Sequence, residues 1–355
     1  MNDGLIFSDA LIAIVILAVL FLGFIITVII YYRRSVKPLQ PYLYLLARLS
    51  PREKAIRTKK DILSGQSPSI SDLIKYYSQT QEQASIDTLD RVLQQHLQQV
   101  FDEISEDVPS VMRTLLQALS LEDEIVLVDA LVKQATSDDD SLTEDEIRSL
   151  PRKTIPASIV KKAISATSLP SLKQILEPTV HAMYIDPDAN EPYRKTDLER
   201  DVLAAALEIT SKPCYAEIRP IMQSIIDKNN LILSLQLINT ASQAQISYIE
   251  GGFISVAELA TADSVDSIIA LLKKSYETQT ALYSQSINDP EELVRKVTLS
   301  FQKEYAGDAS RQKFQHPIRI VRYVLEKIAE MVNVRTTVLA GEMRMGSDDI
   351  ERMLV

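Results

Sequence analysis

The stretch Ser264-Val265-Asp266-Ser267-Ile268-Ile269-Ala270-Leu271-Leu272 decides the fold prediction. A serine at its start, an acid in the first turn and apolar residues three and four positions apart predict the beginning of an amphipathic helix. Two other stretches follow the same pattern, Ser69–Tyr77 and Ser168–Leu176, and the three starts are 99 and 96 residues apart in chain order. Recurrence at a nearly constant period predicts a fold built from repeated units.

The segments that precede two of these copies also resemble each other. Gly251–Ser255 lies before Ser264, and Lys153–Pro156 lies before Ser168. Each consists of a break, an apolar residue and a Ser or Pro that starts a short helix. Capped amphipathic helices are common, so coincidence is the alternative for the nine-residue pattern by itself. The shared upstream segments favour three diverged copies of a helical subdomain of roughly a hundred residues.

The composition favours an all-α protein. The 355 residues include only 8 glycines and no tryptophan, which fits helices better than a barrel or sandwich with many tight turns. The sequence contains no sustained alternation of apolar and polar residues, which is the pattern that would predict a strand. The formal net charge of −10 argues against a nucleic-acid partner, and favours basic partners or plain solubility. A single cysteine, Cys214, excludes an internal disulfide framework and a cysteine-based metal site.

No local motif for catalysis or cofactor binding is present. The only adjacent glycines, Gly251 and Gly252, lack the following Lys-Ser or Lys-Thr that would hold a phosphate. They predict a turn that ends a helix and needs a positive φ. The histidines His96, His181 and His316 are scattered, without the spacing of a ligand pair. We therefore predict no catalytic residue, no metal site and no cofactor.

An apolar run near the N-terminus predicts a membrane anchor. Ala10–Tyr32 is 23 residues long without a charge, and as a helix it would measure about 34 Å, enough for a hydrocarbon core of about 30 Å. A cleaved signal peptide is the alternative, but the acids Asp3 and Asp9 and the length of the run favour an uncleaved anchor. The positive-inside rule then predicts a single-pass protein of the cell membrane, with the N-terminus outside and the main domain cytoplasmic. The basic residues that set this orientation are Arg33, Arg34, Lys37 and Arg48.

The last long helix contains two unusual choices. We predict helices over Pro290–Ala306 and Pro317–Leu339, separated by a polar break and ended by Gly341. Asn333 is a poor helix former in mid-helix, and Glu330 and Arg335 are five positions apart, which is not the best spacing for a local ion pair. These side chains are predicted to bond to another element; a solvated helix face is the alternative.

Four motifs occur in an order that resembles one protein family, the C subunits of archaeal A-type ATP synthases, which are the counterparts of the d subunits in vacuolar-type ATPases. The resemblance covers about residues 40 to 355. Its motifs are the Tyr-rich opening Tyr42–Arg48, the Asp-x-x-Asn-Leu helix Ile226–Leu231 followed by the Gly-Gly turn Ile249–Ser255, the Glu-x-x-Asn-x-Arg pattern of Glu330, Asn333 and Arg335, and the ending Gly341, Gly346 and Asp348–Met353.

The resemblance implies a fold of three similar helical subdomains arranged as a funnel. Together with the apolar run it suggests an anchor over 1–34, a linker over 35–41 and a helical domain over 42–355 that resembles this family. The repeats would cover about 42–108, 109–200 and 201–300, closed by C-terminal helices over 301–355. The residues carried over as structural or partner-contact candidates are Tyr44, Arg48, Asn230, Gly251, Gly252, Glu330, Asn333 and Arg335.

The function implied by the resemblance is mechanical and non-catalytic. A protein of this kind joins the central stalk of an A/V-type ATPase to its ring of ion-carrying membrane helices, with about one copy in each complex, and transmits torque for proton or sodium transport. The expected partners are therefore the central-stalk proteins and the rotor ring, with membrane lipid around residues 10–32. The alternative is a membrane-tethered helical scaffold or adaptor that is unrelated to ATPases.

Overall fold

The regular structure of this chain is helical. The computed structural model describes residues 21–30, 42, 45–49, 69–78, 85–136, 142–150, 154–189, 192–240, 248–279, 283, 289–312, 316–343, 345, 350 and 354–355. Within these residues no strand occurs, and the one extended pairing is an isolated bridge between Ile185 and Tyr193. The prediction of an all-α fold is confirmed.

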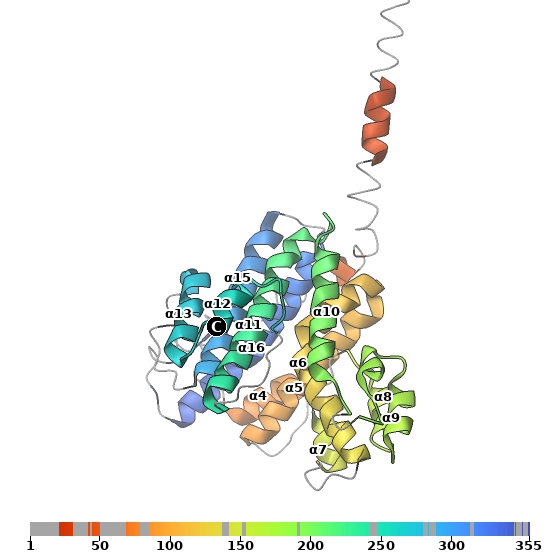
Figure 1. Cartoon of the computed structure of the whole chain (residues 1–355), viewed down its shortest axis with the longest axis vertical. Helices are drawn as coiled ribbons and strands as arrows, with labels where there is room; N and C mark the ends of the chain where they lie inside the picture. Colours follow the sequence, from red (N-terminus) through yellow and green to blue (C-terminus); the bar gives the residue numbers. More distant parts are fainter. Residues whose placement is uncertain are drawn as a thin grey trace, which may run out of the picture.

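Among the residues that the structure describes, six long helices form the body of the molecule (Figure 1). In spatial order, α16 packs on α15, α15 on α11, α11 on α10, and α10 on α6, while α5 packs on α16. Neighbours in space are therefore often distant in sequence. The bounds are α5 Ile86–Asp107, α6 Ser110–Ala135, α10 Lys195–Thr210, α11 Arg219–Thr240, α15 Pro290–Gln312 and α16 Ile318–Glu342.

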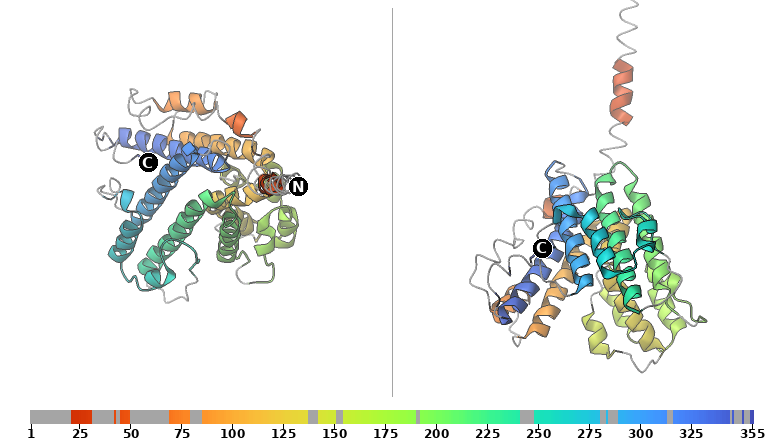
Figure 2. Two further views of the ribbon diagram at one scale, coloured as in Figure 1. Left: turned by 90° about the horizontal axis from the view of Figure 1, so that it is seen from above. Right: turned by 60° about the vertical axis from the view of Figure 1, so that its left-hand side comes forward.

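Shorter helices lie against these long ones. The first of them, α4, packs on α5, so that an N-terminal element lies beside the C-terminal α16 (Figure 2). The bounds are α4 Ile70–Ser78, α7 Glu144–Ser149, α8 Ala157–Ala163, α9 Leu169–Leu176, α12 Val256–Ala260 and α13 Val265–Ser275, with short 3-10 turns η3 Val180–Tyr184, η4 Ala216–Ile218 and η5 Glu277–Gln279.

Each of the three repeated sequence patterns starts a helix. Ser69, Ser168 and Ser264 directly precede α4, α9 and α13. The hydroxyl of Ser264 accepts a hydrogen bond from the N–H of Ser267 at 3.3 Å, and that of Ser69 accepts one from Asp72 at 3.2 Å. Ser168 makes no such side-chain bond, and Pro170 stands in the first turn of its helix, where a missing N–H does no harm. The predicted helix starts are confirmed at all three places.

Apolar side chains gather in one main core and in satellite clusters. The main core lies where α5, α6, α10, α11 and α16 meet, and it includes the fully buried Leu116, Leu127 and Met222. A second cluster joins α11 to α13 and α15, and a third joins α4 and α5 to α16. Burial of apolar surface between sequence-distant helices is the main stabilising force of such a body.

Gly307 does not interrupt a helix as the sequence pattern predicts, whereas the predicted end at Gly341 is correct to within one residue. Helix α15 continues through Gly307 to Gln312, and α16 continues through Gly341 to Glu342. A Cβ atom added at either glycine would meet nothing within 4 Å. A glycine inside a helix costs only about 1 kcal/mol relative to alanine, and packing of the rest of each helix outweighs that cost.

The prediction of a single-pass membrane protein is wrong for the structure as described. Among the described residues no helix is long and apolar enough to cross a membrane. Of the run 10–32, the structure describes a helix over 21–30, which stands apart from the helical body (Figure 1); the remainder of the run and the predicted linker 35–41 lie outside the described residues.

Candidate functional site

A buried asparagine on α11 fixes the segment that follows this helix. Asn230 is 1% exposed. Its Nδ2 donates to the carbonyl of Ile249 at 2.8 Å, and its Oδ1 accepts from the N–H of Ile249 at 2.9 Å. A carboxamide has the same donor and acceptor as a peptide group, so this pair of bonds replaces a backbone partner for Ile249.

One turn before Asn230, a buried carboxylate on the same helix holds the next part of that segment. Asp227 is fully buried and accepts hydrogen bonds from the N–H groups of Phe253 and Ile254, both at 3.1 Å. The hydroxyl of Tyr276, just after α13, donates to the same carboxylate at 2.7 Å. Burial raises the pKa of Asp227 to about 6, although these three hydrogen bonds act in the opposite direction.

The two adjacent glycines allow the turn to approach α11. Gly251 has a φ of 104°, so the predicted positive φ is confirmed, but among the described residues this turn lies directly before α12 and does not end a helix. At Gly252 a Cβ atom would lie 2.0 Å from Oδ1 of Asp227. The turn therefore needs glycine for conformation at the first position and for space at the second. We call Asp227, Asn230, Gly251, Gly252 and Tyr276 the α11 cluster.

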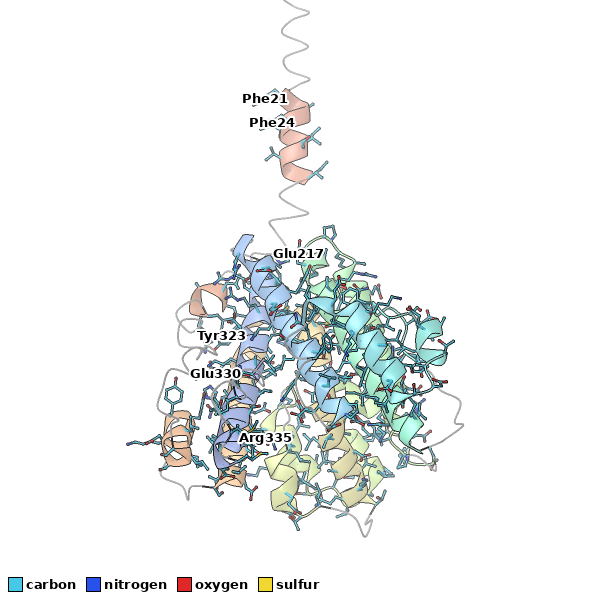
Figure 3. The ribbon with its side chains drawn as sticks, turned by 90° about the vertical axis from the view of Figure 1, so that its left-hand side faces the viewer. Phe21, Phe24, Glu217, Tyr323, Glu330 and Arg335 are labelled. Carbon is cyan, nitrogen blue, oxygen red and sulfur yellow. The ribbon has the colours of Figure 1, made fainter. Side chains whose placement is uncertain are left out.

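A second cluster lies on α16 (Figure 3). Glu330 is 1% exposed and accepts from the hydroxyl of Tyr77 on α4 at 2.9 Å and from Nζ of Lys327 at 2.7 Å. Asn333 donates to the carbonyl of Val355 at 2.9 Å and accepts from its N–H at 2.7 Å. The prediction that Glu330 and Asn333 bond to other elements is confirmed. These residues form the α16 cluster.

The predicted arginines are placed at the surface. Arg335 pairs through Nε with Asp90 of α5 at 3.1 Å, and its side chain is 59% exposed. Arg48 pairs with Asp107 at 2.6 Å. Each arginine joins two elements, as predicted for Arg335, but exposed pairs of this kind contribute little to stability. The predicted candidate Tyr44 lies outside the described residues.

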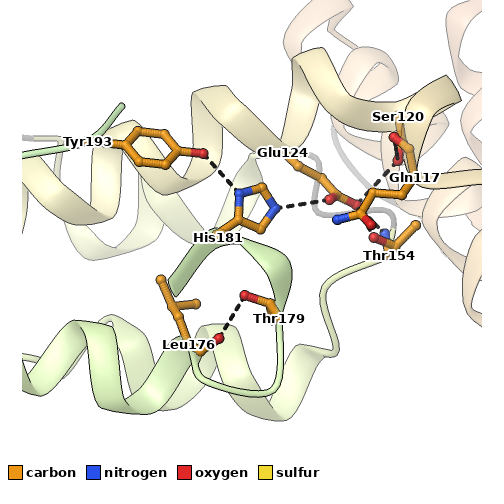
Figure 4. Close-up of polar contacts among 8 residues, drawn as sticks. All are labelled: Gln117, Ser120, Glu124, Thr154, Leu176, Thr179, His181 and Tyr193. Atoms are coloured by element: carbon orange, nitrogen blue, oxygen red, sulfur yellow. Dashed lines mark hydrogen bonds and ion pairs between the residues drawn. The ribbon is translucent and has the colours of Figure 1, made fainter. Parts of the chain in front are cut away.

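A third cluster, on α6, was missed by the sequence analysis (Figure 4). Glu124 is fully buried and accepts from the N–H of Thr154 at 2.6 Å and from its hydroxyl at 2.5 Å. Its second oxygen contacts Nε2 of His181 at 3.2 Å, and Nδ1 of that ring contacts the hydroxyl of Tyr193 at 2.9 Å. These four residues form the α6 cluster. The sequence did contain a signal for this cluster: the second copy has Glu124 followed by Ile125 where the third copy has Asn230 followed by Leu231.

The three clusters share one arrangement. In each, a buried acid on a long helix, Glu124, Asp227 or Glu330, accepts from a side chain of a short-helix segment. Two of these acids are followed three residues later by an asparagine that bonds both backbone groups of one residue. A spacing of three places both side chains on one face of the helix. The buried acids and asparagines of these clusters thus fasten short segments to long helices.

A charged network joins three of the long helices at a partly open position. Glu122 of α6 pairs with Lys228 of α11 at 2.8 Å and also with Arg295 of α15. Burial by itself would raise the pKa of the Glu122 carboxyl, but the ammonium and guanidinium groups outweigh it and lower the pKa to about 2. The Glu122 side chain is 41% exposed, so solvent screens both pairs and the network orients the helices more than it stabilises them.

No metal centre is formed by the residues that the structure describes, since nowhere among them do three His, Cys, Asp or Glu side chains converge.

A cavity of about 300 Å³ lies between α4, α5 and α16 beside the α16 cluster. His96 lies in the wall of this cavity. Burial lowers the pKa of its imidazole, and the nearby Lys327 ammonium lowers it further. The residues that line the cavity are Tyr76, His96, Gln99, Val100, Glu103, Tyr323 and Lys327.

Replacement of Asn230 by alanine is expected to lower the free energy of unfolding by about 2–3 kcal/mol, because both backbone groups of Ile249 lose their buried partner. Urea unfolding followed by circular dichroism measures this change. The neighbouring substitution Asn229→Ala is the control, since Asn229 is only half-buried, and it should change stability by less than about 0.5 kcal/mol. Equal effects of the two substitutions would contradict the assigned role.

Asp227 is expected to make the protein more stable in mild acid. Its pKa is about 6 in the folded chain against 3.8 as the ordinary value, so the native state binds a proton more tightly than the unfolded chain. This contribution is complete below pH 3.8 and is lost as the pH rises through about 6. Relative to Asp227→Asn, the unsubstituted chain should gain about 1 kcal/mol between pH 7 and pH 5. A difference between the two proteins that does not change with pH would disprove this assignment.

The fold and these clusters define a class of protein: an all-helical body whose buried polar side chains fasten its own elements together. The particular family follows from comparison with known sequences. The chain belongs to the ATP synthase (C/AC39) subunit family, whose sequence profile matches residues 45–353. A search of curated proteins gives no match. The resemblance stated from the sequence motifs is therefore confirmed, and the chain is related to subunits of A/V-type ATPases.

Proposed function

We propose that this chain is the non-catalytic component that joins the central stalk of an A/V-type ATPase to its membrane ring and transmits torque between them. The family membership supports the complex. The observation that carries the mechanical role is the set of three buried clusters, each of which fastens a short-helix segment to a long helix. A part that transmits torque must be stiff, and close-packed interiors with satisfied polar groups are stiff.

The same proposal includes three repeated subdomains arranged as a funnel. Helices α4, α9 and α13 start at the three repeated sequence patterns, and each of the three clusters ties a segment near one of them to α16, α6 or α11. The same kind of acid therefore performs the same task three times. Glu330 lies in the C-terminal helices and not in the first repeat, so α16 would complete the first unit. With that pairing, the recurrence supports three similar units.

Among the predicted candidates, exposure separates two roles. Asn230, Glu330 and Asn333 are buried and bonded within the chain, and Gly251 and Gly252 are packed in the turn, so these residues act on partners through the shape they maintain. Arg48 and Arg335 have exposed side chains and are the better candidates for direct contact with the stalk or the ring. We keep Tyr44 as a prediction from the resemblance.

The test is recovery of the complex from the source cells. Tagged full-length chain, extracted gently with detergent, should bring ATPase catalytic proteins and ring proteins with it, at about one copy of this chain per complex. An untagged preparation is the control for adsorption. Recovery of the chain by itself, or with unrelated proteins, would support the helical scaffold instead. Family membership already argues against a scaffold that is unrelated to ATPases.

A further inference from the structure

The turn after α11 is held by a carboxylate that receives hydrogen bonds and gives none. Oδ2 of Asp227 accepts from the N–H of Phe253 and from the hydroxyl of Tyr276, and Oδ1 accepts from the N–H of Ile254. All three partners act as donors, and an ionised carboxylate is the form that suits three donors. A protonated carboxyl group carries an O–H of its own and has fewer positions at which it can accept.

The same turn presents an aromatic side chain to solvent. Phe253 is 43% exposed, although its own backbone N–H is bonded inside the protein. Its ring packs edge-on against Tyr276 and Phe301, with centroid distances of 6.1 and 5.7 Å, and the rings of Tyr276 and Phe301 are 5.2 Å apart. Any rotation of the Tyr276 ring therefore disturbs the support beneath Phe253.

We propose that Asp227 is a pH-sensitive latch: when its carboxylate takes up a proton, Tyr276 is released and the exposed Phe253 changes its packing. Of the three donors, the two N–H groups are fixed by the turn, which Gly252 seats directly on Asp227. The Tyr276 hydroxyl belongs to a side chain and not to the backbone of the turn, so it is the donor that we expect to give way. This inference does not depend on the proposed ATPase function.

The surroundings of Asp227 place the transition in mild acid. Because burial raises the pKa of this carboxyl to about 6, it protonates before ordinary surface carboxylates do. Among the described residues, the titratable side chain that faces it is Tyr276. Several charged groups on the packed elements have other partners: Lys228 pairs with Glu122, Glu258 of α12 with Lys274 of α13, Lys273 lies over Tyr283, and Glu304 of α15 bonds to Gln279.

The test uses the absence of tryptophan from this chain. In full-length protein carrying Phe253→Trp, the emission of the single tryptophan should change as the pH falls from 7.5 to 5, with a midpoint near 6. Adding Asp227→Asn should abolish the change. Adding Glu258→Gln, which removes a neighbouring exposed carboxylate, should leave it in place. Far-ultraviolet circular dichroism should stay constant, since protonation of Asp227 does not unfold the chain.

A transition that persists with Asp227→Asn, or an emission that stays constant in the Phe253→Trp protein, would overturn the proposal. If the tryptophan variant does not fold, the tyrosine band in the near-ultraviolet circular dichroism of the unsubstituted chain takes its place. That band should change with a midpoint near pH 6 in the unsubstituted chain and remain constant in Asp227→Asn. A constant band in both proteins would equally reject the latch.

Discussion

Replacing Glu124 by alanine is expected to lower the free energy of unfolding by about 3–5 kcal/mol. The carboxylate is fully buried and is bonded to both Thr154 and His181. Without it, the N–H of Thr154 and the imidazole of His181 remain in an apolar interior with a lost partner, and each such group costs about 1–3 kcal/mol. The loss of side-chain volume adds a cavity. Urea unfolding of the full chain, followed by circular dichroism, measures the change.

A control on the same helix separates burial from charge. Asp129 forms an ion pair with Lys133 at 3.3 Å, and both side chains are substantially exposed. Asp129→Ala should therefore reduce stability by less than about 1 kcal/mol. Glu124→Gln keeps the volume and one acceptor, so its effect should lie between the two alanine variants. A loss below about 1 kcal/mol for Glu124→Ala would contradict the assignment of Glu124 as the fastening residue of the α6 cluster.

Replacing Gly252 by alanine is expected to lower the free energy of unfolding by about 2–4 kcal/mol. The added methyl group would lie 2.0 Å from Oδ1 and 3.0 Å from Cγ of Asp227. Either the turn or the aspartate must move, and both movements stretch the hydrogen bonds to Phe253 and Ile254. Thermal and urea unfolding both report the loss, and hydrogen exchange at these two amides should become faster.

The chain provides a matched control for this substitution. Gly307 lies inside α15, where an added Cβ atom would meet nothing within 4 Å. Gly307→Ala should therefore stabilise the protein by about 0.5–1 kcal/mol, because alanine is the better helix former. The same chemical change thus has opposite signs at two positions. If Gly252→Ala were neutral or stabilising, the close approach of the turn to Asp227 would be wrong.

The sequence predicted local features better than partners. The Gly251-Gly252 turn followed from the only adjacent glycines in the chain, and the three helix starts followed from capping and periodicity. Glu330 was expected to bond to another element, but its partner Tyr77 is 253 residues away, and a single sequence carries no signal for that pairing. Glu124 is one of 48 acidic residues, and only its alignment with Asn230 of the third copy marked it as different from an ordinary solvated acid.

Other differences have a similar physical origin. Gly307 was expected to interrupt a helix, since glycine disfavours helix interiors by about 1 kcal/mol. The apolar face of α15 buries enough surface to outweigh that local preference. His181 was seen as a scattered histidine, and only the fold brings it to Glu124 from 57 residues away. Tertiary packing decides both cases.

The contact between α4 and α16 has a consequence for synthesis of the chain. The Tyr77–Glu330 hydrogen bond joins residues 253 positions apart, so α4 leaves the ribosome long before the helix that completes its packing exists. At ordinary elongation rates the wait is roughly 10–50 s. During that time the apolar face of α4, with Leu73 and Ile74, has only α5 to cover it. The apolar face of α4 therefore remains without its full set of packing partners for most of the time that the chain is being synthesised.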